Sequence, residues 1–158
     1  MNNLIKQKDL PDLLKKLRHQ KKTIVFTNGV FDILHRGHIN YLAKAKAFGD
    51  VLIVGLNSDT STRRLKGKNR PVCGQNDRAA LLLALKVVDY VVIFREDTPA
   101  KLIEKIHPDV LVKGADYKLS EIVGMAFVRS YGGIVRRIKL TSGRSTTRTI
   151  GKIIRLIR

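Results

Sequence analysis

Apolar and polar positions follow two patterns along the chain, and each pattern is typical of a different element. Short continuous apolar runs, rich in β-branched residues, predict strands at 23–26, 51–56, 90–94 and 109–112. Residues 134–138 are predicted to form a short strand at an edge of the sheet. Between the strands, apolar residues recur every three or four positions and predict helices over 8–21, 39–48, 75–88, 98–107, 121–130 and 148–158. This alternation predicts an α/β protein with a doubly wound, parallel, five-stranded sheet flanked by helices.

The length of 158 residues suits one compact unit. We expect residues 1–22 to supply an N-terminal helix that covers the sheet, and residues 23–158 to form a single domain. No apolar run reaches 18 residues, so no membrane span is expected. The N-terminus lacks the apolar core of a signal peptide, and Cys73 has no partner for an internal disulfide. We therefore expect a cytoplasmic protein.

The net charge of +18 arises from 31 basic and 13 acidic residues, and no acidic residue follows Glu121. Such a field favours anionic partners such as nucleotides, RNA or an anionic membrane surface. With four Tyr, five Phe and no Trp, the chain offers little surface for base stacking. We therefore expect a solvated basic surface without an obligate nucleic-acid partner. A basic nucleic-acid-binding protein on the same fold is the alternative from another class.

The turn between the first strand and the next helix carries the densest group of candidate functional residues. In an α/β sheet, such a turn lies outside the carboxyl end of a strand, where ligands bind. Gly37 allows close approach of the backbone to a ligand, and the start of a helix offers unpaired N–H groups to an anion. His35 and His38 add side-chain donors, so phosphate is the favoured ligand. The alternatives are structural histidines or a zinc site, for which ligands are few in this chain.

The pattern Gly-x-Phe-Asp-x-x-His-x-Gly-His resembles the histidine signature of the nucleotidylyltransferase superfamily, which implies a Rossmann-like sheet. Matching strings extend the resemblance to the heptose 1-phosphate adenylyltransferases at 27–32, 57–59, 64–67, 70–72, 96–99, 111–117 and 121–124. It implies transfer of AMP from ATP to a sugar 1-phosphate (heptose 1-phosphate) with release of pyrophosphate, giving ADP-heptose for lipopolysaccharide core synthesis. The alternative is a cytidylyltransferase acting on glycerol 3-phosphate or another small phosphate. It is less favoured because residues 140–143 lack the arginine usual in those enzymes.

The resemblance also implies roles for individual residues. His35, His38 and Lys66 are expected to be catalytic. The sugar phosphate is expected to contact Asp32, Asp59 and Arg78, although either aspartate could instead cap local backbone. Magnesium is expected through the phosphates of ATP, with no protein ligand assigned, and relatives suggest a homodimer. Residues expected to bind the nucleotide are Asn28, Gly29, Val30, Phe31, Gly37, Gly114, Asp116, Ser145, Thr146 and Thr147.

Two further segments allow more than one interpretation. The basic loop 63–71 is either a solvated loop or a flap that closes over phosphates. In the last helix, Ser145 is a suitable N-cap. Isoleucines at 150, 153, 154 and 157 fall at helical spacing and predict a closing helix packed on the core. An amphipathic basic helix on a membrane or on RNA is the alternative for this segment.

Overall fold

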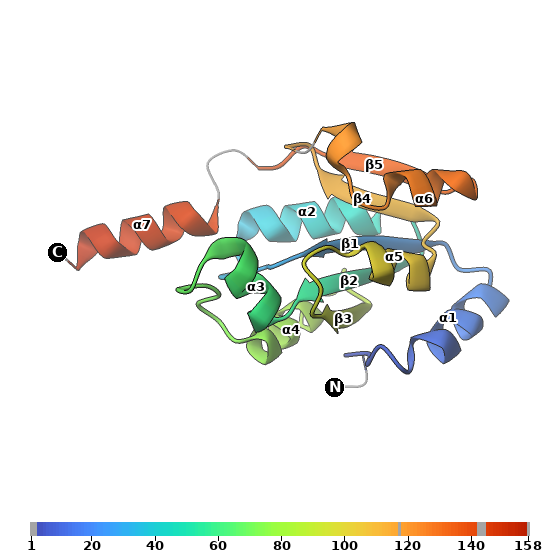
Figure 1. Ribbon diagram of the computed structural model, residues 1–158, viewed down its shortest axis with the longest axis horizontal. Helices are drawn as coiled ribbons and strands as arrows, with labels where there is room; N and C mark the ends of the chain where they lie inside the picture. The colour runs from blue at the N-terminus through green and yellow to red at the C-terminus, as the bar shows by residue number, and fades with distance from the viewer. Residues whose placement is uncertain (1–2, 117, 142–144, 158) are drawn as a thin grey trace.

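A computed structural model describes residues 3–116, 118–141 and 145–157 of the chain. Its centre is a parallel five-stranded sheet in the order β3-β2-β1-β4-β5 (Figure 1). This confirms the predicted α/β doubly wound sheet. The order reverses between β1 and β4, and ligands bind at this point in sheets of this kind. The strands are β1 (Ile24–Gly29), β2 (Val51–Asn57), β3 (Tyr90–Phe94), β4 (Val110–Gly114) and β5 (Ile134–Ile138).

Helices cover both faces of the sheet. Leucines of α1 pack in one core with α5, α6 and alternate strand residues such as Phe26, whereas α2 and α4 pack in a second core with Val25 and its equivalents. Because both faces of the inner strands β1, β2 and β4 are buried, these strands read as largely apolar runs. The helices are α1 (Leu10–His19), α2 (Arg36–Lys46), α3 (Asp59–Lys66), α4 (Gln75–Leu83), α5 (Ala100–Ile106), the 3-10 turn η1 (Leu119–Glu121), α6 (Met125–Ser130) and α7 (Thr146–Leu156).

The two edges of the sheet are finished differently. At the β3 edge, the N-terminal segment lies alongside the strand: Ile5 N donates to Val91 O at 2.8 Å, and Val91 N donates to Asn3 O at 3.0 Å. This pairing precedes α1 and was not predicted from the sequence. At the opposite edge, β5 exposes the side chains of Arg136 and Arg137.

Several helices differ from the prediction at their ends. Helix α2 begins at Arg36, three residues earlier than predicted. The predicted loop 63–71 is helical as far as Lys66 because Ser58 caps α3, its Oγ accepting from Ser61 N at 3.2 Å, and Gly67 ends the helix at φ 94°. The helix predicted over 121–130 starts only at Met125, because Gly124 adopts φ 84°.

The last helix, α7, corrects the prediction that its isoleucines pack on the core. None of its described residues is buried, and Ile153 and Ile154 are 49% and 44% exposed. Figure 1 shows α7 extending beyond the sheet. The N-cap prediction is confirmed, since Ser145 Oγ accepts from Arg148 N at 3.2 Å. Helical spacing therefore predicted that α7 has an apolar face, but it could not predict whether another part of the protein covers that face.

A bilayer span would require a long apolar helix. Within the described ranges, no helix has both the length and the apolar content that this requires.

Candidate active site

A pocket of about 590 Å³ lies at the carboxyl ends of β1 and β4, where the strand order reverses. Its volume falls within the range of small-molecule binding sites. The turn after β1, the start of α2, the segment after α3 and the start of α7 all contribute to its wall. Residues predicted from the sequence that line it are Asn28, Gly29, Val30, Phe31, Asp32, His35, Gly37, His38, Lys66, Gly114, Asp116, Ser145, Thr146 and Thr147.

A second hollow, of about 700 Å³, lies along α1 and shares no lining residue with this pocket. Lysine and leucine side chains make up much of its wall, including Lys8, Lys15 and Lys105. The pocket at the strand ends brings together histidines, carboxylates, hydroxyls and glycine backbone, so we take it as the candidate site.

His35 and His38 stack at the start of α2, with His35 at the N-cap and His38 in the first turn. Their ring centroids lie 3.9 Å apart with 13° between the planes, and Phe31 meets His38 edge-on at 5.4 Å. Burial first, and the neighbouring His35 second, lower the pKa of His38 to about 4, against the opposing effect of Asp32. His38 is therefore a neutral imidazole at neutral pH.

The buried Nδ1 of His38 has no hydrogen-bond partner among the described residues. Buried polar nitrogens of this kind are rare in native proteins because desolvation without a partner is costly. His38 as a residue belongs to the pocket wall.

The turn before α2 has an unusual backbone. Phe31 and Ile33 adopt φ angles of 48° and 50°, in the left-handed region that β-branched Ile rarely enters. The ring of Phe31 folds back over Gly29, where an added Cβ would lie 3.0 Å from Phe31 Cε2. Glycine at this position therefore permits the turn that wraps backbone around the pocket.

Lys113 is a pocket residue to which the sequence analysis assigned no role. Its Nζ donates to Asn28 Oδ1 across β4 and β1, and the residue is only 9% exposed. Burial lowers the pKa of Lys113 to about 8, and Asp116 opposes that shift. Gly114 leaves room for the Asp116 carboxylate, which an added Cβ would strike. A lysine directly after the apolar run 110–112 and before Gly114 was the signal that could have identified it.

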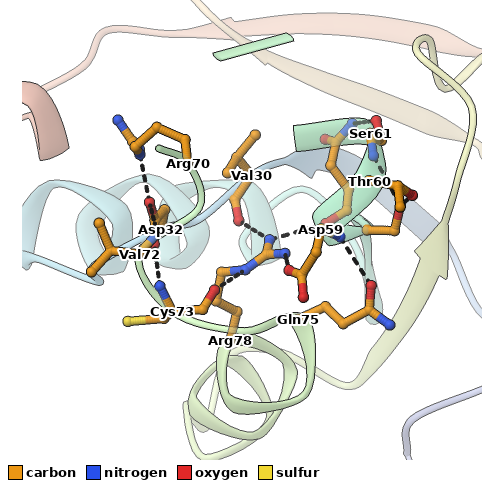
Figure 2. A network of polar contacts seen from close by, with 12 residues as sticks. Val30, Asp32, Asp59, Thr60, Ser61, Arg70, Val72, Cys73, Gln75 and Arg78 are labelled. Atoms are coloured by element: carbon orange, nitrogen blue, oxygen red, sulfur yellow. Dashed lines mark hydrogen bonds and ion pairs between the residues drawn. The ribbon is translucent and has the colours of Figure 1, made fainter. Parts of the chain in front are cut away.

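Asp32 joins the histidine turn to the segment after α3 (Figure 2). Its Oδ2 accepts from Arg70 Nε at 2.7 Å and Val72 N at 2.9 Å, and its Oδ1 accepts from Cys73 N at 3.0 Å. Burial acts to raise the pKa of Asp32, but hydrogen bonds from Cys73, Val72 and Arg70 outweigh it and leave the pKa below its usual value. Asp32 is thus ionised, with both carboxylate oxygens occupied. Its backbone oxygen also accepts from Thr146 Oγ1 at 2.6 Å.

Asp59 and Arg78 were expected to contact the sugar phosphate, but neither lines the pocket. Arg78 is fully buried and donates to Cys73 O at 2.9 Å, Val30 O at 2.6 Å and Asn57 O at 3.0 Å. Its Nη2 pairs with Asp59 at 2.7 Å (Figure 2). Four acceptors surround the guanidinium, which ties strand ends together outside the pocket lining. Contact of Asp59 and Arg78 with the sugar phosphate stays a prediction. The sequence shows the charge of Arg78 but not its burial.

Two helices begin at the pocket, α2 with His35 as its N-cap and α7 with Ser145 as its N-cap. The first N–H groups of a helix and its positive dipole end favour anions. Lys66, at the end of α3, adds an exposed cation to the wall. The arrangement suits a ligand with several phosphates.

A metal ion would find few protein ligands in this pocket. Within the described part of the chain, no three His, Cys, Asp or Glu side chains gather closely enough to hold one. Of the four carboxylates in the lining, Asp32 and Asp97 form ion pairs with arginines at 2.7 and 2.6 Å. The other two, Asp116 and Glu121, form no ion pair with a described residue. This set fits Mg²⁺ held mainly by ligand phosphates, with at most one or two carboxylates.

Comparisons with known proteins identify related sequences and structures. Residues 26–150 match the family described as cytidylyltransferase-like. The chain is 54% identical over 146 residues to the bifunctional protein HldE of Geobacter sulfurreducens and 55% identical over 146 residues to that of Helicobacter pylori strain Shi470. These matches cover 92% of this chain but only 30% and 31% of the two relatives, so the chain spans about a third of their length.

Two solved structures share the fold. The lipopolysaccharide core biosynthesis protein from Thermoplasma volcanium superposes with a TM-score of 0.63 at 39% identity, over 75% of this chain and 98% of that one. Pantoate-beta-alanine ligase from Francisella tularensis has a TM-score of 0.62 at 16% identity, over 91% of this chain and 69% of its own, a likeness of fold alone. By its sequence match over residues 26–150, the chain belongs to the cytidylyltransferase-like family of nucleotidyltransferase domains.

Proposed function

We propose that this protein transfers the adenylyl group of ATP to a sugar 1-phosphate, with heptose 1-phosphate as the acceptor, and releases pyrophosphate. The observation that carries the proposal is the stacked pair His35 and His38, at the start of a helix in the pocket where the sheet order reverses. The sequence identity of 54% with an HldE protein and of 39% with a lipopolysaccharide core biosynthesis protein supports the choice of acceptor. The product would be ADP-heptose for lipopolysaccharide core synthesis.

In this mechanism the triphosphate of ATP lies between the starts of α2 and α7. His35 and His38 donate hydrogen bonds to it, and Ser145, Thr146 and Thr147 contribute hydroxyl and backbone donors. Lys66 stabilises the charge that develops at the α-phosphate. Preorganised donors of this kind each contribute about 10²–10³ in turnover.

The acceptor reacts through its own phosphate. A phosphate oxygen forms a bond to the α-phosphorus of ATP while the bond from that phosphorus to the pyrophosphate oxygen breaks, so the electron pair leaves with pyrophosphate. The attacking oxygen is already ionised at neutral pH, and no general base is required. Catalysis then consists of in-line positioning and charge stabilisation.

The rest of the lining forms the nucleotide site. Backbone of residues 28–31, with Gly114 and Asp116, surrounds the ribose and base in this proposal. Magnesium bound through the phosphates of ATP would neutralise their charge. We also propose that the protein acts in the cytoplasm, where ATP is available, as a homodimer that sedimentation velocity can test.

The test supplies the protein with ATP or CTP, magnesium and a panel of sugar phosphates, and measures pyrophosphate release. We expect release with ATP and heptose 1-phosphate, and a loss of about 10²–10³ in turnover for His38→Ala with an unchanged circular dichroism spectrum. Undiminished transfer by His38→Ala would contradict the mechanism. Turnover of CTP with glycerol 3-phosphate would identify the cytidylyltransferase alternative. Salt-sensitive RNA binding without any pyrophosphate release would support the nucleic-acid-binding alternative.

A further inference from the structure

We propose that Arg70 binds the phosphate of the acceptor substrate, and that Asp32 acts on this substrate through Arg70 as a positioning residue. The inference rests on the proposed function and names a binding residue for its second substrate. It also changes the role of Asp32, for which direct contact with the sugar phosphate was expected.

Arg70 presents unused donors to the pocket. Its side chain is 17% exposed and belongs to the pocket wall, and Nε donates to Asp32 Oδ2 at 2.7 Å. A guanidinium carries five N–H donors. Among the described residues this is the one side-chain hydrogen bond of Arg70, so both Nη groups are available to a ligand. Two parallel N–H groups match the oxygens of a phosphate.

Asp32, by contrast, is unsuited to contact a phosphate itself. It is 1% exposed, ionised, and bound through both carboxylate oxygens to three donors. A carboxylate and a phosphate would repel each other at close range. Its negative charge instead orients the guanidinium of Arg70.

The backbone beyond Arg70 is held as firmly as its side chain. Figure 2 shows Arg70 and Cys73 approaching Asp32 from opposite sides, and the N–H groups of Val72 and Cys73 both donate to this carboxylate. Arg78 holds Cys73 O at 2.9 Å from behind. An arginine fixed at both its side chain and the following backbone loses little freedom when it binds a ligand.

The position of Arg70 in the pocket indicates which substrate it meets. In the sheet order, β2 and β4 lie on opposite sides of β1. Of the proposed nucleotide residues, Gly114 ends β4 and Asp116 follows it, whereas Lys66 and Arg70 follow β2. The histidine turn after β1 lies between the two groups. A nucleotide on the β4 side leaves the β2 side, with Arg70, for the phosphate that attacks.

The test compares Arg70→Gln, Arg70→Lys and, as a matched control, the exposed arginine variant Arg129→Gln. Turnover is measured with heptose 1-phosphate varied at saturating ATP, and binding of a non-hydrolysable ATP analogue is measured without acceptor. We expect Arg70→Gln to raise KM for the sugar phosphate about 10- to 100-fold and to change analogue binding less than about twofold. The KM of Arg70→Lys for the sugar phosphate should lie between those of the wild type and Arg70→Gln, because lysine keeps the charge but lacks the planar guanidinium. Arg129→Gln should alter neither quantity.

The role of Asp32 is tested by a double-mutant cycle. Asp32→Asn should raise KM for the sugar phosphate in the wild-type background but change it little in the Arg70→Gln background, because its effect passes through Arg70. Equal effects in both backgrounds would overturn the positioning role.

Two outcomes separate this inference from the proposed function. If the wild type turns over and Arg70→Gln leaves KM for the sugar phosphate unchanged, the inference is wrong and the proposed function stands. Weaker analogue binding by Arg70→Gln and Arg70→Lys alike would assign Arg70 to the nucleotide and overturn the inference as well. If the wild type releases no pyrophosphate with any acceptor, the proposed function fails and the inference fails with it.

Discussion

Lys113 of β4 donates a hydrogen bond to Asn28 of β1 across the point at which the strand order reverses. The ammonium group is largely buried, and burial lowers the pKa of Lys113 to about 8. Holding a proton on a buried lysine opposes folding at neutral pH. Its place in the wall of a pocket suited to phosphates suggests that the charge is kept for a ligand.

We therefore expect Lys113→Met to raise the free energy of unfolding at pH 7 by about 1–3 kcal/mol while weakening binding of an ATP analogue. The folded-state pKa of Lys113 is lowered from 10.5 to about 8, so the unfavourable contribution is complete below pH 8 and fades as the pH rises toward 10.5. The stability advantage of the variant should shrink accordingly. Urea unfolding at pH 7 and at pH 10 measures it, and a variant less stable than the wild type at pH 7 would contradict the prediction.

His38 should take up a proton when ATP binds. In the free protein the pKa of His38 is lowered to about 4, burial being the main cause, and phosphate charge beside the imidazole would raise it. ATP should thus bind more tightly as the pH falls from 6.5 toward 4. Calorimetry at pH 6 in buffers of different ionisation enthalpy measures the uptake. Because ATP also titrates, the difference from His38→Gln is the relevant quantity, and equal uptake by both proteins would refute the prediction.

Arg78 should contribute to stability more than to substrate contact. Arg78→Met would leave Asp59 and three carbonyl oxygens without their donor, so we expect a loss of about 3–5 kcal/mol in the free energy of unfolding. The exposed control Arg129→Met should change it by less than about 0.5 kcal/mol. Urea denaturation of both variants provides the comparison; similar midpoints would show that the buried network contributes little.

The exposed face of α7 predicts tolerance to polar substitution. Ile154 is 44% exposed, so Ile154→Ser should change the free energy of unfolding by less than about 0.5 kcal/mol. Ile103 is fully buried on α5, so Ile103→Ala should lower the free energy of unfolding by about 2–5 kcal/mol. Thermal unfolding of the two variants measures the contrast. A loss for Ile154→Ser of the same size as that for Ile103→Ala would mean that α7 packs on an apolar surface.

Features determined by neighbouring residues were predictable from the sequence. Apolar runs located β1 to β4 because these strands are largely buried, and the turn from β1 into α2 brought His35 and His38 into one pocket. The Ser145 cap was predictable for the same reason, since its acceptor and donor lie three residues apart.

Contacts between distant segments were not predictable. Arg70 and Asp32 are 38 residues apart, and Lys113 and Asn28 are 85 apart, so no local pattern links them. Burial of Arg78 depends likewise on the backbone oxygens of Val30 and Asn57, which lie 48 and 21 residues away. Spacing gave α7 an apolar face, but whether another surface covers that face depends on tertiary placement.

The unlike edges of the sheet bear on how the protein behaves at high concentration. An unpaired strand edge is a template for intermolecular β-pairing and aggregation. Residues 3–5 pair with the edge of β3 and so block it. The edge strand β5 carries exposed arginines, whose like charges repel a second copy of the protein. Resistance to aggregation through the β3 edge therefore depends on an intact N-terminal segment. Resistance through the β5 edge depends on ionic strength, because added salt screens the repulsion between arginines.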